Sequence, residues 1–170
     1  MRWIMPVVAL CCLLCSCAQR SRPVDIYHSN ILQAGKIITV AAFSPTPLGE
    51  PVSPSYIANN FAKLLRPACK AAIPVGQLAS EAEAFAAAEA NGSDYLVLVT
   101  LVEWYAGAYS EIRAALEARV VELDGKTTLQ TQVFEKDGNV LTASYLRNNP
   151  WELIEETVEA WVNNTLFTHP

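Results

Sequence analysis

The segment from Tyr95 to Trp104, YLVLVTLVEW, constrains the fold of this chain more than any other part of the sequence. It is rich in β-branched residues and stays apolar on both faces until Glu103. A strand with two apolar faces has to be covered on both sides, which is typical of a strand inside a sheet. The sequence therefore predicts a central strand over residues 95–104.

The other elements follow from hydrophobic periodicity and from proline and glycine punctuation. The short apolar run at 71–75 contains Pro74, which confines that strand to a sheet edge. Ser80 and Glu83 have capping-box spacing, and Gly92 suits the left-handed position that ends a helix. In chain order we expect a strand at 36–43, a helix from Pro54 to Pro67, a strand at 71–75, a helix at 81–90, strands at 95–104, 112–123, 127–134 and 140–145, and a helix opening at Asn149–Pro150.

The segment at 112–123 fits two patterns. Its apolar residues alternate with charged ones, as in a half-buried strand, but several of them also fall on one helix face. We choose the strand because Asp124–Gly125 follows it as a hairpin signal. Asp137–Gly138 is expected to form the next turn.

These elements predict an α+β fold, a two-layer sandwich with three helices on one face of a mostly antiparallel sheet. The chain has 170 residues, which suits one domain, expected over residues 36–170. Hydrophobic residues make up 52% and charged residues 17%, a composition that excludes intrinsic disorder. The formal net charge of -5 argues against a nucleic-acid-binding face, so we expect no nucleic-acid partner.

Residues 1–16 have the pattern of a bacterial secretory signal, with Arg2 before a long apolar stretch. The sequence Leu14-Cys15-Ser16-Cys17 resembles the lipobox of bacterial lipoproteins, although Ala, Ser or Thr is usual where Cys15 stands. In a lipobox the last Cys is acylated and becomes the first residue of the mature chain. The resemblance implies that Cys17 is the lipidation site and that the chain is anchored to a membrane.

Three other interpretations of this segment are open. A transmembrane anchor needs about 20 apolar residues, and the apolar segment here is shorter and contains Pro6. Cleavage by the ordinary signal peptidase would use Ser16 and Ala18 and release a soluble protein. Cys15 is a poorer acylation site than Cys17, because Leu14 would directly precede the cut.

Residues 17–35 are expected to form the lipidated Cys and a polar tether. Ala18 follows the acylated residue where an Asp would retain a lipoprotein in the inner membrane, so by analogy the protein faces the periplasm from the outer membrane. Processing leaves Cys69 as the only body cysteine, which excludes an internal disulfide. We expect Cys69 to be a core residue, with pairing between chains as the alternative.

A further resemblance rests on three short segments that follow the helix-ending Asn91–Gly92. They are DYLV at 94–97, VEW at 102–104 and RVVELDGK at 119–126. These segments resemble an uncharacterised family of small bacterial lipoproteins with an Asp-Tyr-hydrophobic-x-x-Trp strand followed by a Val-x-Asp-x-x-x-Gly-Lys hairpin. The element order is similar, more distantly, to the α/β domains of the curli-secretion lipoprotein and the TolB N-terminus. Tyr105 departs from the acidic residue common after the Trp. The resemblance implies this fold and an envelope location, and no activity.

The sequence contains no set of residues typical of catalysis. Its two histidines, His28 and His169, fall in the tether and at the penultimate position, where a rigid general base is not expected. Phosphate-binding glycine loops and zinc-ligand spacings are missing from the sequence, and its acidic pairs are typical of solvated faces. We therefore expect no enzyme activity, no cofactor and no metal.

The cluster of Glu103, Trp104, Tyr105 and Tyr109, expected where the central strand meets a loop, is the candidate interaction surface. Aromatic residues at a strand end can form a binding hot spot, or they can simply close the edge of a core. The first functional hypothesis is an envelope lipoprotein that docks on a protein partner or on itself. The alternative is a small-ligand or lipid-binding accessory of an envelope transport system. A hydrolase is a distant third.

Overall fold

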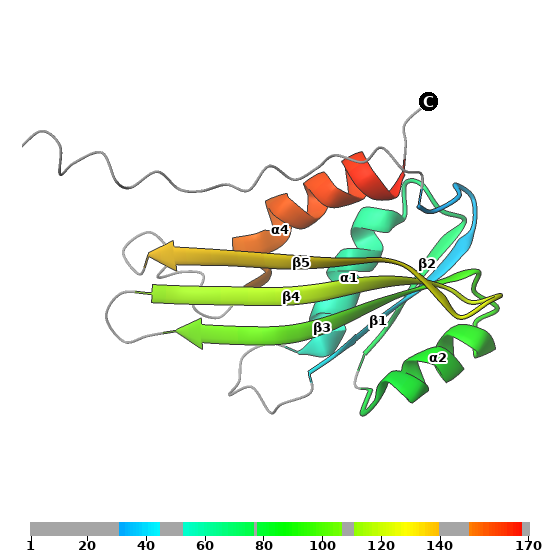
Figure 1. Ribbon diagram of the computed structural model, residues 1–170, viewed down its shortest axis with the longest axis horizontal. Coiled ribbons are helices and arrows are strands. Elements are labelled where there is room, and N and C mark those ends of the chain that lie inside the picture. The colour runs from blue at the N-terminus through cyan, green and yellow to red at the C-terminus, as the bar shows by residue number, and fades with distance from the viewer. Residues whose placement is uncertain (1–30, 45–52, 77, 107–110, 140–149, 168–170) are drawn as a thin grey trace, which may run out of the picture.

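The computed structural model describes residues 31–44, 53–76, 78–106, 111–139 and 150–167. Its elements alternate first between strand and helix and then run as three long strands before the last helix (Figure 1). They are β1 (Ile37–Phe43), α1 (Pro54–Leu65), β2 (Ala71–Val75), α2 (Glu81–Ala90), β3 (Tyr95–Ala106), β4 (Glu111–Glu122), β5 (Thr127–Asn139), α4 (Pro150–Trp161) and a π-helical turn, η3 (Val162–Leu166).

The five strands form one mixed sheet in the order β2-β1-β3-β4-β5. The short strands pair in parallel, β1 with both β2 and β3, whereas the long strands β3, β4 and β5 pair antiparallel. Most of the backbone pairing is therefore antiparallel, and the predicted α+β sandwich is confirmed. The predicted places of β3 at the centre of the sheet and of β2 at its edge are confirmed as well.

The position of α2 differs from the expectation of three helices on one face. Helices α1 and α4 share one face, and α2 packs on the opposite face, near the end where β4 turns into β5 (Figure 1). Parallel crossovers are right-handed, and the chain steps from β1 to β2 in one direction and back past β1 to β3 in the other. The reversal places α1 and α2 on opposite faces of the sheet.

The main core lies between the sheet and the pair α1 and α4. It buries alternate residues of β1, β3 and β4 and aromatic side chains from four elements, α1, β3, β5 and α4. Phe61 of α1 meets the Trp151 ring edge-on at a centroid distance of 5.1 Å. Phe134 of β5 meets Trp161 in the same way at 5.3 Å. These contacts fasten α4 to β5 and α1. Cys69 packs half-buried against this core, and burial raises the pKa of its thiol.

The smaller core lies under α2, which is built almost wholly from alanine and glutamate. Ala84 and Ala88 are fully buried against Leu96 and Leu98 of β3, because small side chains let the helix approach the sheet closely. Ion pairs from Glu81 to Arg119 and from Glu89 to Lys126 tie the helix to β4 and to the hairpin. The predicted N-cap is confirmed, since the Ser80 hydroxyl accepts a hydrogen bond from the Glu83 amide.

Of three predictions about the later strands, one is confirmed, one needs correction and one falls outside the described residues. Residues 112–123 are a strand and not a helix, as we chose, because β4 covers nearly the same range. Asp137–Gly138 is not a turn, since both residues lie inside β5 and pair with Arg113 and Ile112 of β4. The dipeptide signal is overridden by the long β4 ladder. The strand expected at 140–145 lies outside the described residues.

The Phe134 side chain, 2% exposed, should carry much more stability than its neighbour Val133, which is 51% exposed. We expect Phe134→Ala to lower the free energy of unfolding by about 3–5 kcal/mol, because it empties an aromatic site in the main core. The matched control Val133→Ala should cost less than about 1 kcal/mol. Chemical denaturation of both variants checks this. Equal losses would contradict the orientation of β5.

Candidate functional site

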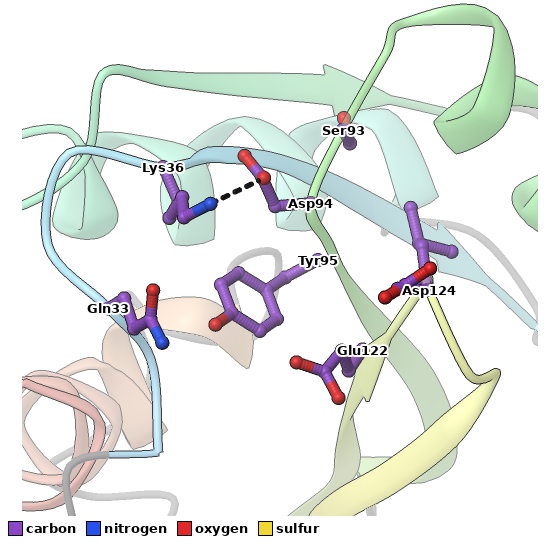
Figure 2. Close-up of a pocket in the computed structure, with 8 residues that line it drawn as sticks. Gln33, Lys36, Ser93, Asp94, Tyr95, Glu122 and Asp124 are labelled. Carbon is purple, nitrogen blue, oxygen red and sulfur yellow. Dashed lines mark hydrogen bonds and ion pairs between the residues drawn. The ribbon is translucent and has the colours of Figure 1, made fainter.

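A pocket lies where β1 and β3 begin and β4 ends (Figure 2). It has a volume of about 530 Å³ and a largely polar wall. Figure 2 shows Lys36 and Asp94 joined on one side, Glu122 and Asp124 on the other, and the Tyr95 ring between them. Its lining residues are Gln33, Lys36, Ser93, Asp94, Tyr95, Glu122, Leu123 and Asp124.

The end of α2 delivers Asp94 to this pocket. Gly92 adopts a positive φ of 62°, and the amides of Gly92 and Ser93 donate to the carbonyls of Glu89 and Ala88. This pair of bonds is a Schellman motif, which closes a helix and turns the chain sharply. Only glycine takes the left-handed backbone without strain, so the predicted role of Gly92 is confirmed.

Asp94 ties three strands together. Its carboxylate accepts hydrogen bonds from the Ile37 amide at 2.9 Å and from Lys36 Nζ at 3.0 Å. Its own amide donates to the Ile37 carbonyl at 2.8 Å, and its carbonyl accepts from the Leu123 amide at 3.0 Å. One residue thus holds the starts of β1 and β3 against the end of β4.

The electrostatics of this joint favour the ionised pair. The Ile37 amide, together with Lys36, lowers the pKa of the Asp94 carboxyl, and the Asp94 carboxylate raises the pKa of Lys36. Both side chains are partly solvent-exposed, so the pair is a bridge with moderate energy and not a buried charge. A carboxylate held by two donors and kept ionised is poorly suited to accept a proton, which makes the joint structural rather than catalytic. No group of three or more Cys, His, Asp or Glu side chains in the described ranges is placed to hold a metal ion.

A second hollow lies between β5 and α4. It has a volume of about 230 Å³, with aromatic rings in its wall and amide and hydroxyl groups around them. Its lining residues are Gln132, Phe134, Thr157, Ala160, Trp161, Asn164 and Thr165. We call this hollow the α4–β5 groove. It runs beside a strand that ends the sheet, because β5 has a described neighbour on one side only, β4.

The predicted interaction surface is only partly described. Glu103 is exposed on β3, directly after a bulge that leaves Val102 53% exposed. The backbone of Trp104 and Tyr105 does not lie at a strand-to-loop junction, as expected, but continues β3 and pairs with Ala114 and Arg113. Tyr109 and the lipidation site Cys17 lie outside the described residues, so both remain predictions.

Sequence reasoning missed both hollows. The Asp94 joint had a signal, since Asp94–Tyr95 belongs to the segments that carry the family resemblance. The sequence signal for the α4–β5 groove was weaker. The segment at 127–134 contains neither a charged residue nor a proline, which is unusual for an edge strand. The amphipathic pattern of 150–161 predicted a helix but did not show which strand it packs against.

Comparison with known proteins supports the fold. No protein-family model matches the chain, and no curated protein matches it. Among solved structures, the PelC dodecamer from Paraburkholderia phytofirmans is similar, with a TM-score of 0.59 and 12% identity over 81% of this chain and 92% of that one. Lipoprotein GNA1162 from Neisseria meningitidis is similar too, with a TM-score of 0.51 and 16% identity over 76% of this chain and 96% of that one. At these identities the likeness shows a shared fold.

The described helices contain none that is both long and apolar enough to cross a membrane. The predicted signal precedes the described residues, whereas the last part of the predicted tether, residues 31–35, is described and places Leu32 in the main core.

The joint predicts how stability changes with acid. A carboxyl whose pKa is lowered by folding stabilises the fold above its unfolded pKa of about 3.9, and this contribution is lost as the pH falls through the folded pKa. We expect Asp94→Asn to cost about 1 kcal/mol at pH 7, after allowance for solvent exposure, or about 3–5 °C in Tm. The Tm difference from wild type should hold down to about pH 5 and shrink below about pH 4.

Asp124→Asn is the matched control for this test, because it removes a carboxylate from the same pocket without touching the Asp94 hydrogen bonds. Thermal melts of both variants across this pH range give the answer. A Tm difference for Asp94→Asn that stays constant through pH 3 would show that its ionised form does not hold the joint.

Proposed function

We propose that this chain is a bacterial envelope lipoprotein, anchored in the outer membrane through an acylated Cys17, whose α+β domain binds a protein partner in the periplasm. The lipobox supports the anchor, and the fold shared with lipoprotein GNA1162 supports an envelope domain. The proposal assigns the domain an interaction role and no catalytic one, in keeping with a sequence that places its two histidines in the tether and at the chain end.

The observation that carries the interaction role is the edge of β5. This strand is 13 residues long and ends the sheet. An edge strand presents unpaired backbone donors and acceptors to any chain that approaches, and proteins usually blunt such edges with proline or charge. From Thr127 to Phe134 this strand has neither. A long unprotected edge beside a groove is suited to binding another chain.

Self-association is the second form of this proposal. The PelC structure is of a dodecamer, so a protein with a similar fold can self-associate. A second copy of the present chain would bring its own acidic α4 with it. That helix has four glutamates and no lysine or arginine. Two copies that met at α4 would therefore repel each other.

The alternative, a small-ligand accessory, depends on the pocket at Asp94. Its volume of about 530 Å³ falls within the roughly 300–1,000 Å³ of small-molecule sites, but its wall is polar where those sites are mostly apolar. The α4–β5 groove, at about 230 Å³, is below that range and suits single side chains.

Intact mass of the membrane-fraction protein tests the anchor. We expect the wild-type chain to begin at Cys17 with added acyl mass, because Cys17 holds the acceptor position of the lipobox. Cys17→Ala should lose both the acyl mass and this start, while the matched Cys15→Ala should keep them. A wild-type chain that begins near Gln19 and is soluble would overturn the anchoring proposal.

A further inference from the structure

Helix α4 lies beside the outer edge of β5, and side chains of both elements line the groove between them. Thr157, Ala160 and Trp161 of α4 face Gln132 and Phe134 across the α4–β5 groove. A groove between an edge strand and a helix accepts an extended chain, which pairs with the strand and places alternate side chains against the helix. Main-chain hydrogen bonds then supply affinity, and the groove supplies specificity.

The backbone of β5 is open to such pairing. The carbonyl of Val133 accepts a hydrogen bond at 2.9 Å from the side-chain amide of Gln132, which acts as a local donor that an incoming strand can replace. The Val133 side chain points away from the α4 side, where Phe134 is buried, and remains 51% exposed. An added strand would cover Val133 with its own apolar residue on that face.

Two polar atoms near the groove lack partners. The Trp161 indole N–H and the Gln130 side-chain oxygen are buried, and neither has a hydrogen-bond partner within the described residues. Trp161 is itself only 6% exposed and lines the groove, and Gln130 lies two residues before Gln132 on the same side of β5. Neither atom is accessible from the groove, so the class of occupant depends on the strand edge and on charge.

Charge selects the class of occupant. Helix α4 carries Glu152, Glu155, Glu156 and Glu159, and it contains no basic residue. Glu156 lies one turn before Ala160, so its carboxylate belongs to the same side of the helix as the groove wall. A lysine or arginine can lay its aliphatic stem over the Phe134 and Trp161 rings and keep its charge near Glu156.

We propose that the α4–β5 groove binds an extended, basic segment of an envelope partner protein, which adds to the edge of β5 as a further strand. Its basic side chains face α4 and its apolar side chains cover Val133. This inference rests on the proposed function and names the site and the partner chemistry for it. Second copies of this chain fit less well, because they are acidic at the same helix.

Peptide binding to the acylated full chain in detergent tests the groove. The probe is a short fluorescent peptide of alternating lysine and valine, with fluorescence polarisation as the readout. We expect it to bind at low salt, and we expect weak or no binding for the same peptide with glutamate in place of lysine. A peptide with a central proline should also fail, because proline removes a ladder hydrogen bond.

Two variants locate the binding. Glu156→Lys should weaken binding several-fold, since it reverses the charge beside the groove wall at Ala160. Ala160→Tyr should weaken it similarly by filling the groove, and because Ala160 is exposed the fold should tolerate it.

Glu117→Lys is the matched control, with the same change of charge on the opposite face of the sheet, where it pairs with Val133. Unchanged affinity in the α4 variants, or equal binding of the glutamate or proline peptide, would overturn the proposal.

Photo-crosslinking in cells separates this inference from the proposed function. A photoreactive residue at position 160 should capture a partner protein, and Glu156→Lys should reduce the capture. Capture only from position 102, on the other face of the sheet, would overturn the groove and leave the interaction function standing. A homodimer captured from position 160 would contradict the basic partner, and no capture from either position would contradict the interaction function itself.

Discussion

The handedness of two short crossovers determines the arrangement of the whole domain. Strand β1 lies between β2 and β3, so the chain first steps outward and then returns past its starting point. Right-handed connections send α1 and α2 to opposite faces as a result. The last helix then packs beside α1, over β5 and β4, and the three long strands extend beyond α2 on the other face (Figure 1). An open strand edge beside α4 follows from this topology.

The strand ends around Asp94 and the β5 edge of the sheet differ in how fully their hydrogen-bonding groups are paired. At one end, Asp94 joins β1, β3 and β4 through backbone and side-chain hydrogen bonds, and a Schellman turn fixes its position. Along the far side, β5 pairs with β4 alone among the described strands and has no charge before Glu135. The domain therefore combines a rigid joint with a strand edge that keeps its capacity for hydrogen bonding. That combination agrees with the proposed interaction role, in which β5 is the edge that binds a partner.

Local patterns in the sequence predicted what local physics decides. The apolar run at 95–104, the alternation at 112–123 and the Ser80 cap all matched the structure. The errors came from long-range effects. The ladder between β4 and β5 carries β5 through Asp137–Gly138, and the separate ladder between β3 and β4 carries β3 past Trp104. The placement of α2 depends on the order of the strands in the sheet, which no single segment encodes. The α4–β5 groove lies between two elements, and hydrophobic periodicity predicts each element but not that they pack together.

Amide hydrogen exchange, followed by NMR in the acylated full chain, tests the central claim that the edge of β5 is free to bind. Along residues 130–136 the outward amides should exchange fast and alternate with slow amides that bond to β4. The lysine–valine peptide should slow the fast set and leave the slow set unchanged. Uniform protection of this stretch in the free protein would show that another part of the chain already covers the edge, and it would contradict the account.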